Sequence, residues 1–147
     1  MPFVLISCSG DSSKKKAKPL DTANILRETQ PHKKSAKKTA FHPGQAVYNE
    51  YCLACHQSDG SGIAGMYPPL SQNQYILNKD KLIDVVLNGM SGKIEVNGDI
   101  YNNFMVPHSH LSDEELANVI SYVRSNFGND LEPVTKEEIA AFRKNEE

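Results

Sequence analysis

One short segment limits the fold of this chain more than any other: Cys52, Cys55 and His56 form the pattern Cys-x-x-Cys-His. Residues three apart lie on the same side of a helical turn, so the two thiols point the same way. The imidazole follows one position later. The three side chains can therefore hold one flat group, with the thiols at its edge and the imidazole beneath its centre.

The pattern is the attachment motif of c-type haem. Two other interpretations of the cysteines are weaker. A thioredoxin-type redox pair would lie beside a βαβ pattern, and no strand-rich run flanks this segment. A zinc site needs further ligands at matching spacing, which the distant pair His108 and His110 does not have. The sequence therefore predicts one covalently bound haem c.

The methionines are the first candidates for the second axial ligand, because methionine there raises the reduction potential relative to histidine. Met66 follows the motif histidine by only ten residues, a short span for reaching the opposite face of a haem. Met90 ends an apolar-periodic run and is expected in the core. Met105, 49 residues after the histidine, is the favoured ligand. His108 and His110 are its rivals, although polar residues beside a helix start are mostly exposed.

Two stretches near Met105 resemble the class I c-type cytochromes, small bacterial proteins with a single haem. The chain reads Tyr-Asn-Asn-Phe-Met-Val over 101–106 and Leu-Ser-Asp-Glu-Glu over 111–115. In that family a similar methionine segment leads into the terminal helix. The resemblance covers about residues 41–130 and implies an all-α cytochrome c fold, with three to four helices around one haem.

The resemblance also implies roles for individual residues. Cys52 and Cys55 would form thioethers with the haem, and His56 and Met105 would bind its iron. The proline that commonly follows the ligand methionine is Val106 here, which predicts a less rigid loop.

Two further positions match the family. The resemblance implies that Pro68 offers its backbone carbonyl to the other ring nitrogen of His56, with Pro69 as the adjacent candidate. It also implies that Gly44 and Tyr48, four residues apart on the first helix, lie where this helix crosses the last one.

Sequence patterns place the elements before Met105. A first helix begins after Pro43, where proline is tolerated in the first turn. An apolar run predicts a helix over 79–87. Alternation around an Asn-Gly pair predicts a small β-hairpin over 94–100, directly before the methionine loop.

Two capping boxes predict the helices that follow. The first begins the last helix of the body at Ser112; apolar residues recur at helical spacing through Phe127, and Gly128 ends the helix. The second starts a surface helix over 135–143, outside the body, in a C-terminal extension of residues 131–147.

Charge is unevenly divided along the chain. Residues 1–40 contain nine Lys and Arg against three Asp and Glu, whereas residues 41–147 contain seven against fifteen. The acidic body argues against nucleic acid as a partner. Residues 41–130 hold four basic and ten acidic residues, which favours redox partners with a positive docking face. The basic arm has little apolar surface, so a flexible Lys-rich linker is predicted over 9–40.

Residues 5–8, Leu-Ile-Ser-Cys, resemble the lipobox of bacterial lipoproteins, in which the cysteine is lipidated after signal cleavage. We therefore interpret residues 1–8 as the remainder of a lipoprotein signal and predict a membrane anchor on Cys8. The alternative is an ordinary free thiol. No stretch of the chain approaches the ~18 apolar residues of a membrane-spanning helix.

Together these features predict an electron carrier rather than an enzyme. It would shuttle single electrons between respiratory or dehydrogenase partners, in the periplasm or on the outer face of a bacterial membrane. Two alternatives remain: a cytochrome subunit of a larger oxidoreductase complex, and a haem-based sensor or peroxidase-like protein with a displaceable sixth ligand.

Overall fold

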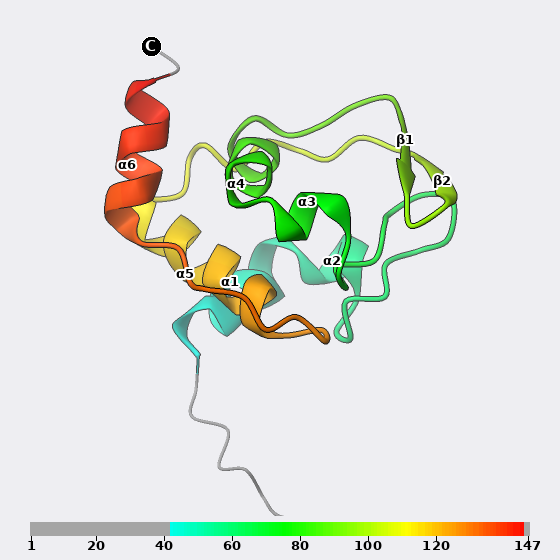
Figure 1. Ribbon diagram of the computed structural model, residues 1–147, viewed down its shortest axis with the longest axis horizontal. Helices are drawn as coiled ribbons and strands as arrows, with labels where there is room; N and C mark the ends of the chain where they lie inside the picture. Colours follow the sequence, from blue (N-terminus) through cyan, green and yellow to red (C-terminus); the bar gives the residue numbers. More distant parts are fainter. Residues whose placement is uncertain (1–41, 146–147) are drawn as a thin grey trace, which may run out of the picture. The chain divides into compact units, whose positions relative to one another are not determined.

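The computed structural model of the protein describes residues 42–145, which form six helices and one β-hairpin (Figure 1). In chain order the elements are α1 (Pro43–Tyr51), α2 (Leu53–His56), α3 (Gln74–Leu77), α4 (Lys79–Asn88), β1 (Lys93–Val96), β2 (Asp99–Asn102), α5 (Asp113–Ser125) and α6 (Lys136–Lys144). The predicted helical fold with a small hairpin is confirmed. The predicted lipobox at Cys8 and the predicted linker over 9–40 lie outside the described residues. Within 42–145, no helix has the length and apolar character needed to cross a membrane.

Helices α1 and α5 cross in close contact because one of them presents a glycine. A Cβ on Gly44 would lie 1.9 Å from the carbonyl oxygen of Asn118 and 2.8 Å from the Cβ of Tyr122. One turn later, Tyr48 is fully buried, and its ring centroid lies 5.4 Å from that of Tyr122 and 5.2 Å from that of Phe127. The expected placement of Gly44 and Tyr48 at the crossing is therefore present.

Helix α5 ends earlier than the sequence predicts. Its last residue is Ser125, and Phe127, expected as a helical core residue, has φ 56°. The side-chain Nδ2 of Asn126 donates to the Tyr122 carbonyl at 2.8 Å, which satisfies an acceptor at the helix end. The turn carries the Phe127 ring back against Tyr48. Phe127 thus packs in the core from a left-handed turn rather than from the helix.

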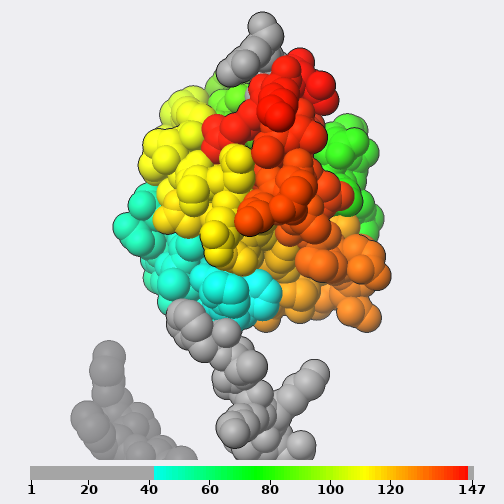
Figure 2. Space-filling view, turned by 90° about the vertical axis from the view of Figure 1, so that its left-hand side faces the viewer, coloured from blue at the N-terminus to red at the C-terminus, as the bar shows by residue number. Residues whose placement is uncertain are grey.

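Helix α6 begins at its predicted capping box, where the Thr135 hydroxyl accepts from the Glu138 amide. The sequence predicts that this helix lies at the surface, outside the body. That prediction is wrong for the side of α6 that faces α5, which is buried. Ile139 is completely buried and belongs to the same hydrophobic core as Leu116 and Ile120 of α5. In Figure 2 the red surface of α6 lies directly against the yellow surface of the chain around residue 110. The helix is amphipathic, and its apolar side needs a partner in order to leave water.

The β-hairpin turns at the predicted Asn97-Gly98 pair. Both residues have positive φ, 53° and 90°, which is the geometry of a type I′ turn. Antiparallel pairing runs from Lys93↔Asn102 to Val96↔Asp99. Val96 and Tyr101 are buried, so these two residues of the hairpin pack against the rest of the protein. The segment that contains Met105 follows directly after β2.

Candidate cofactor site

The two cysteines and the histidine of the motif lie on one helical turn, where α1 passes into α2. The amides of Cys55 and His56 both donate to the carbonyl of Cys52, at 3.2 and 2.9 Å. All three side chains line one cavity. Both thiols are free. Burial, together with the Cys55 sulfur, raises the pKa of Cys52 to about 12, so this group is protonated at neutral pH.

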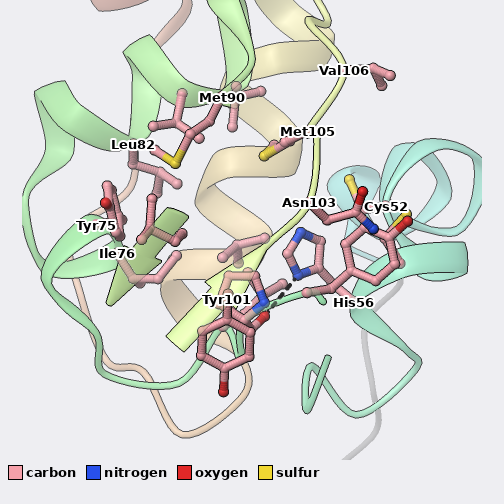
Figure 3. Close-up of a pocket in the computed structure, with 18 of the residues that line it drawn as sticks. Cys52, His56, Tyr75, Ile76, Leu82, Met90, Tyr101, Asn103, Met105 and Val106 are labelled. Carbon is pink, nitrogen blue, oxygen red and sulfur yellow. Dashed lines mark hydrogen bonds between the residues drawn. The ribbon is translucent and has the colours of Figure 1, made fainter. Parts of the chain in front are cut away.

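His56 is held by the backbone of the following loop. Its Nδ1 lies 3.0 Å from the carbonyl oxygen of Pro68. A carbonyl only accepts, so Nδ1 carries the hydrogen and Nε2 keeps its lone pair. In Figure 3 the second ring nitrogen points away from this bond, toward the side of the cavity where Met105 lies. Burial lowers the pKa of His56, although the Pro68 carbonyl acts in the opposite direction, and a neutral imidazole is favoured.

Directly after the motif the chain makes a turn, which a side chain of α1 holds by a hydrogen bond. Gln57, directly after His56, has φ 63°. The buried hydroxyl of Tyr48 donates to the Gln57 carbonyl at 2.6 Å. Further on, a Cβ on Gly60 would lie 2.5 Å from the Phe127 ring. The aromatic cluster of the helix crossing therefore also contacts the chain at this turn and three residues after it.

A glycine allows the loop to bring the Pro68 carbonyl to the histidine. Gly62 has φ 69°, and a Cβ there would lie 2.2 Å from the Tyr67 carbonyl oxygen and 2.7 Å from that of Pro68. The neighbouring Pro69 carbonyl accepts instead from the Asn73 side-chain amide at 2.6 Å. Of the two adjacent prolines, Pro68 is thus the one that contacts the histidine.

Met105 lies on the cavity wall and is paired with Met90, which follows α4. The two residues form an isolated antiparallel bridge, and in Figure 3 they lie along one side of the cavity while His56 lies along another. Gly89 makes this approach possible, because a Cβ there would lie 2.4 Å from the Met105 carbonyl oxygen. The sequence predicts a less rigid loop because Val106 replaces a proline. The backbone bridge to Met90 supplies a constraint in its place.

The rival ligands His108 and His110 differ in burial. His108 is 6% exposed, so the expectation that it faces solvent is wrong. Its amide donates to the Val86 carbonyl at 2.9 Å, and this bond pins the turn against α4. Its ring packs edge-on to Tyr51 with centroids 5.9 Å apart, and its Nδ1 is buried and has no hydrogen-bond partner among residues 42–145. His110 is exposed, as expected, and of the two only His108 lines the cavity.

The cavity has a volume of about 230 Å³ and a mostly apolar and aromatic wall. Besides the motif, the residues that line it include Met66, Tyr67, Pro68, Leu70, Tyr75, Ile76, Leu82, Val85, Val86, Met90, Ile94, Tyr101, Phe104, Met105, Val106 and His108. Such a wall suits a flat, largely apolar macrocycle, and two thiols, an imidazole nitrogen and a thioether are the donors that haem c requires.

The alternatives to haem find no support in the part of the chain that the structure describes. There, no group of three or more His, Cys, Asp or Glu side chains is placed to hold a metal ion directly. The only sheet among these residues is the antiparallel pair β1–β2. A thioredoxin-type βαβ unit is therefore not formed between residues 42 and 145.

Gly62 and Gly89 are site residues that sequence reasoning missed. In the sequence, Gly62 is one of several glycines in a loop, and Gly89 reads as an ordinary helix end. The only local signal is that Gly89 directly precedes a candidate methionine and that Gly62 lies midway between His56 and Pro68. The carbonyl group that packs against each glycine is determined by contacts between residues far apart in the sequence.

Comparisons with known proteins agree with this geometry. Residues 41–127 match the Cytochrome c family. The chain is 37% identical over 110 residues to cytochrome c-552 of Thermus thermophilus, which covers 68% of this chain and 83% of that protein. It is 30% identical over 112 residues to the cytochrome c subunit of the quinone alcohol dehydrogenase of Gluconacetobacter polyoxogenes, covering 74% of this chain and 22% of the subunit. It is 39% identical over 92 residues to the fructose dehydrogenase cytochrome subunit of Gluconobacter japonicus, covering 58% of this chain and 19% of that subunit.

The matched range contains the motif turn, the loop that holds its histidine and the paired methionines. The family match covers more than half of the chain, and its members carry haem c. The chain therefore belongs to the cytochrome c family: it is a monohaem electron carrier with a covalently bound haem c, and it is not itself an enzyme.

Proposed function

We propose that this chain shuttles single electrons outside the cytoplasm, with haem c on Cys52 and Cys55 and with His56 and Met105 as axial ligands. Bound haem supplies a one-electron couple between Fe(III) and Fe(II). The observation that carries the proposal is the 3.0 Å contact between His56 Nδ1 and the Pro68 carbonyl. It fixes the tautomer that leaves Nε2 free to bind a metal, which is how metal-binding histidines are commonly oriented.

The test is maturation of the chain in a host that attaches haem c. We expect one haem per chain in a pyridine haemochrome assay, a mass above that of the polypeptide, and a reversible one-electron titration. Cys52→Ser should lose one of the two covalent links. Cys8→Ser is the matched control and should keep both. A colourless product at the bare polypeptide mass would contradict the proposal.

The electron exit is proposed at the apolar residues that line the cavity and also reach the surface. Met66, Phe104 and Val106 are 47%, 56% and 52% exposed. The acidic surplus of residues 41–130 favours a partner whose docking face is positive. Electron transfer should therefore slow at high salt. Phe104→Ser should weaken binding to the partner without changing its salt dependence.

The partner is proposed to be a dehydrogenase, an oxidase or a reductase, and several relatives are cytochrome subunits of dehydrogenases. For the same reason a permanently bound subunit is the second candidate function. Copurification through high-salt washes separates the two. Ready binding of carbon monoxide to the reduced protein would instead favour a sensor or peroxidase-like role with an open sixth position.

Membrane attachment is proposed through a lipid on Cys8, on the resemblance of residues 5–8 to a lipobox. Cytochromes of this family typically work outside the cytoplasm, where lipoproteins are also found. Mass spectrometry of protein taken from its native membrane should show a diacylglyceryl mass on Cys8. An unmodified segment 1–8 would rule out the anchor.

A further inference from the structure

Helix α6 carries an arginine that contacts the chain between Met105 and α5. Ile139 is completely buried on the inner side of α6. Arg143 follows four residues later, on the same side of the helix. Figure 2 shows the two segments in contact, with the red surface of α6 beside the yellow surface that precedes α5.

Arg143 makes two hydrogen bonds to this segment and a third to the first residue of α5. Its Nε donates to the Asp113 carboxylate at 2.8 Å. Its two terminal nitrogens donate to backbone carbonyls, one to Ser109 at 3.0 Å and the other to Leu111 at 2.7 Å. The guanidinium is planar and its donors have fixed directions. One rigid group therefore sets the relative position of two carbonyls and a carboxylate.

The same segment leads back to Met105 through backbone contacts. His108 donates its amide to the Val86 carbonyl of α4 at 2.9 Å, and Met105 exchanges two hydrogen bonds with Met90. The chain from 105 to 111 is thus tied at three places. Arg143 supplies the last of them and lies beyond the residues that match the family.

We propose that Arg143 is a positioning residue for Met105. By holding the carbonyls at 109 and 111, it limits how far the Met105 segment can move away from the cavity, and so slows release of the sixth ligand. The inference rests on the proposed function, in which Met105 binds the iron. It gives the C-terminal extension a role in the redox site rather than in stability alone.

The experiment measures how fast carbon monoxide binds to the reduced, haem-loaded full chain, since carbon monoxide binds only after Met105 leaves. Arg143→Gln should raise this rate roughly tenfold, the effect of about 1.4 kcal/mol from lost charge-assisted hydrogen bonds. The carbon monoxide binding rate of Arg143→Lys should lie between the rates of the unmodified protein and of Arg143→Gln. A single ammonium group keeps the positive charge but cannot span both carbonyls and the carboxylate.

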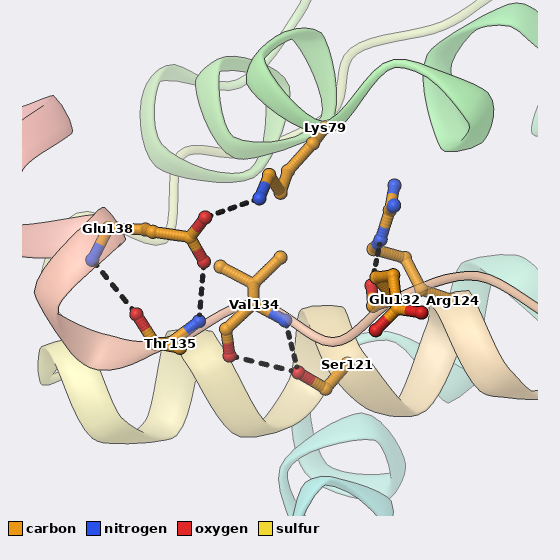
Figure 4. Close-up of polar contacts among 7 residues, drawn as sticks. All are labelled: Lys79, Ser121, Arg124, Glu132, Val134, Thr135 and Glu138. Atoms are coloured by element: carbon orange, nitrogen blue, oxygen red, sulfur yellow. Dashed lines mark hydrogen bonds and ion pairs between the residues drawn. The ribbon is translucent and has the colours of Figure 1, made fainter.

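The matched control is Lys79→Gln. It removes the ion pair between Lys79 and Glu138, which holds the opposite end of α6 (Figure 4). Both variants lose side-chain contacts of α6, three hydrogen bonds of Arg143 or the ion pair of Lys79, so both should lower the melting temperature. Only Arg143→Gln should change carbon monoxide binding and the midpoint potential.

Two results would overturn the role of Arg143: an unchanged rate in Arg143→Gln, or an equal rise in Arg143→Gln and Lys79→Gln, which would assign the effect to docking of α6 as a whole. The variant Met105→Leu distinguishes a failure of this inference from a failure of the proposed ligand role of Met105. If Met105→Leu also leaves the rate unchanged, the ligand assignment fails. If Met105→Leu alone raises it, the ligand assignment stands and only the role of Arg143 is lost.

Discussion

Met90 and Met105 are joined by a reciprocal pair of backbone hydrogen bonds: the Met90 amide donates to the Met105 carbonyl at 3.0 Å, and the Met105 amide donates back at 2.8 Å. Both residues line the cavity, so a substitution of Met90 is a matched control for the same substitution of Met105. We expect Met105→Leu to lower the midpoint potential and open the sixth position to carbon monoxide, because the thioether ligand is lost. Met90→Leu should change neither. Spectra and potentials of the two variants check this, and the reverse pattern would make Met90 the ligand.

The glycines after the motif allow a second matched test. Gly62 and Gly65 both have left-handed φ, 69° and 73°, but a Cβ on Gly65 would meet nothing within 4 Å. Gly65→Ala should lower the free energy of unfolding by about 1 kcal/mol, from backbone strain alone. Gly62→Ala should cost about 3 kcal/mol, because the added Cβ also displaces the Pro68 carbonyl.

Denaturant unfolding of both haem-loaded variants gives these values. Gly62→Ala should also shift the midpoint potential, since the hydrogen bond to His56 is disturbed. Equal losses of stability with unchanged potentials would mean that the loop accommodates the methyl group without moving the histidine contact.

Removal of the haem is expected to unfold much of the body. The chain has no Trp, and several residues of its hydrophobic core also form the cavity wall, among them Leu70, Ile76 and Leu82. A domain of this size is marginal without such a group, and a ligand bound only by the folded state stabilises it. Circular dichroism of protein made without attachment machinery should show low helix content. Cooperative, native-like melting of that protein would refute the expectation.

The contact between α4 and α6 should weaken in acid. The ion pair with Lys79 and the Thr135 amide hold the pKa of Glu138 below its ordinary value of 4.5. A lowered carboxyl pKa stabilises the folded state above the ordinary value, and this contribution is lost as pH falls below it. Lys79→Gln should therefore lower the free energy of unfolding by about 0.5 kcal/mol at neutral pH, as expected for an exposed pair. The difference should shrink as pH falls through the lowered pKa of Glu138, and a difference that persists once Glu138 is protonated would assign it to packing of the Lys79 stem.

Much of the fold follows from local patterns in the sequence. The hairpin is specified by an Asn-Gly pair, whose residues accept the two positive φ values of the turn. The starts of α5 and α6 are specified by capping boxes that form as expected. These features depend on a few neighbouring residues, so the sequence alone predicts them.

The features that sequence analysis missed depend on distant contacts. His108 is buried because its turn is bonded to Val86 of α4. Phe127 leaves the helix because Tyr48, far earlier in the chain, offers it a ring to pack against. The inner side of α6 is buried because α5 presents a complementary apolar side. No periodicity within a single segment carries this information.

The bond from the Tyr48 hydroxyl to the Gln57 carbonyl has a consequence for engineering. Tyr48 belongs both to the crossing of α1 and α5 and to the contacts that hold the turn directly after His56. A transplant of the motif into another scaffold would therefore need the aromatic trio of Tyr48, Tyr122 and Phe127 to travel with it. Moved without them, the turn directly after His56 would lose the hydrogen bond from Tyr48 that holds it.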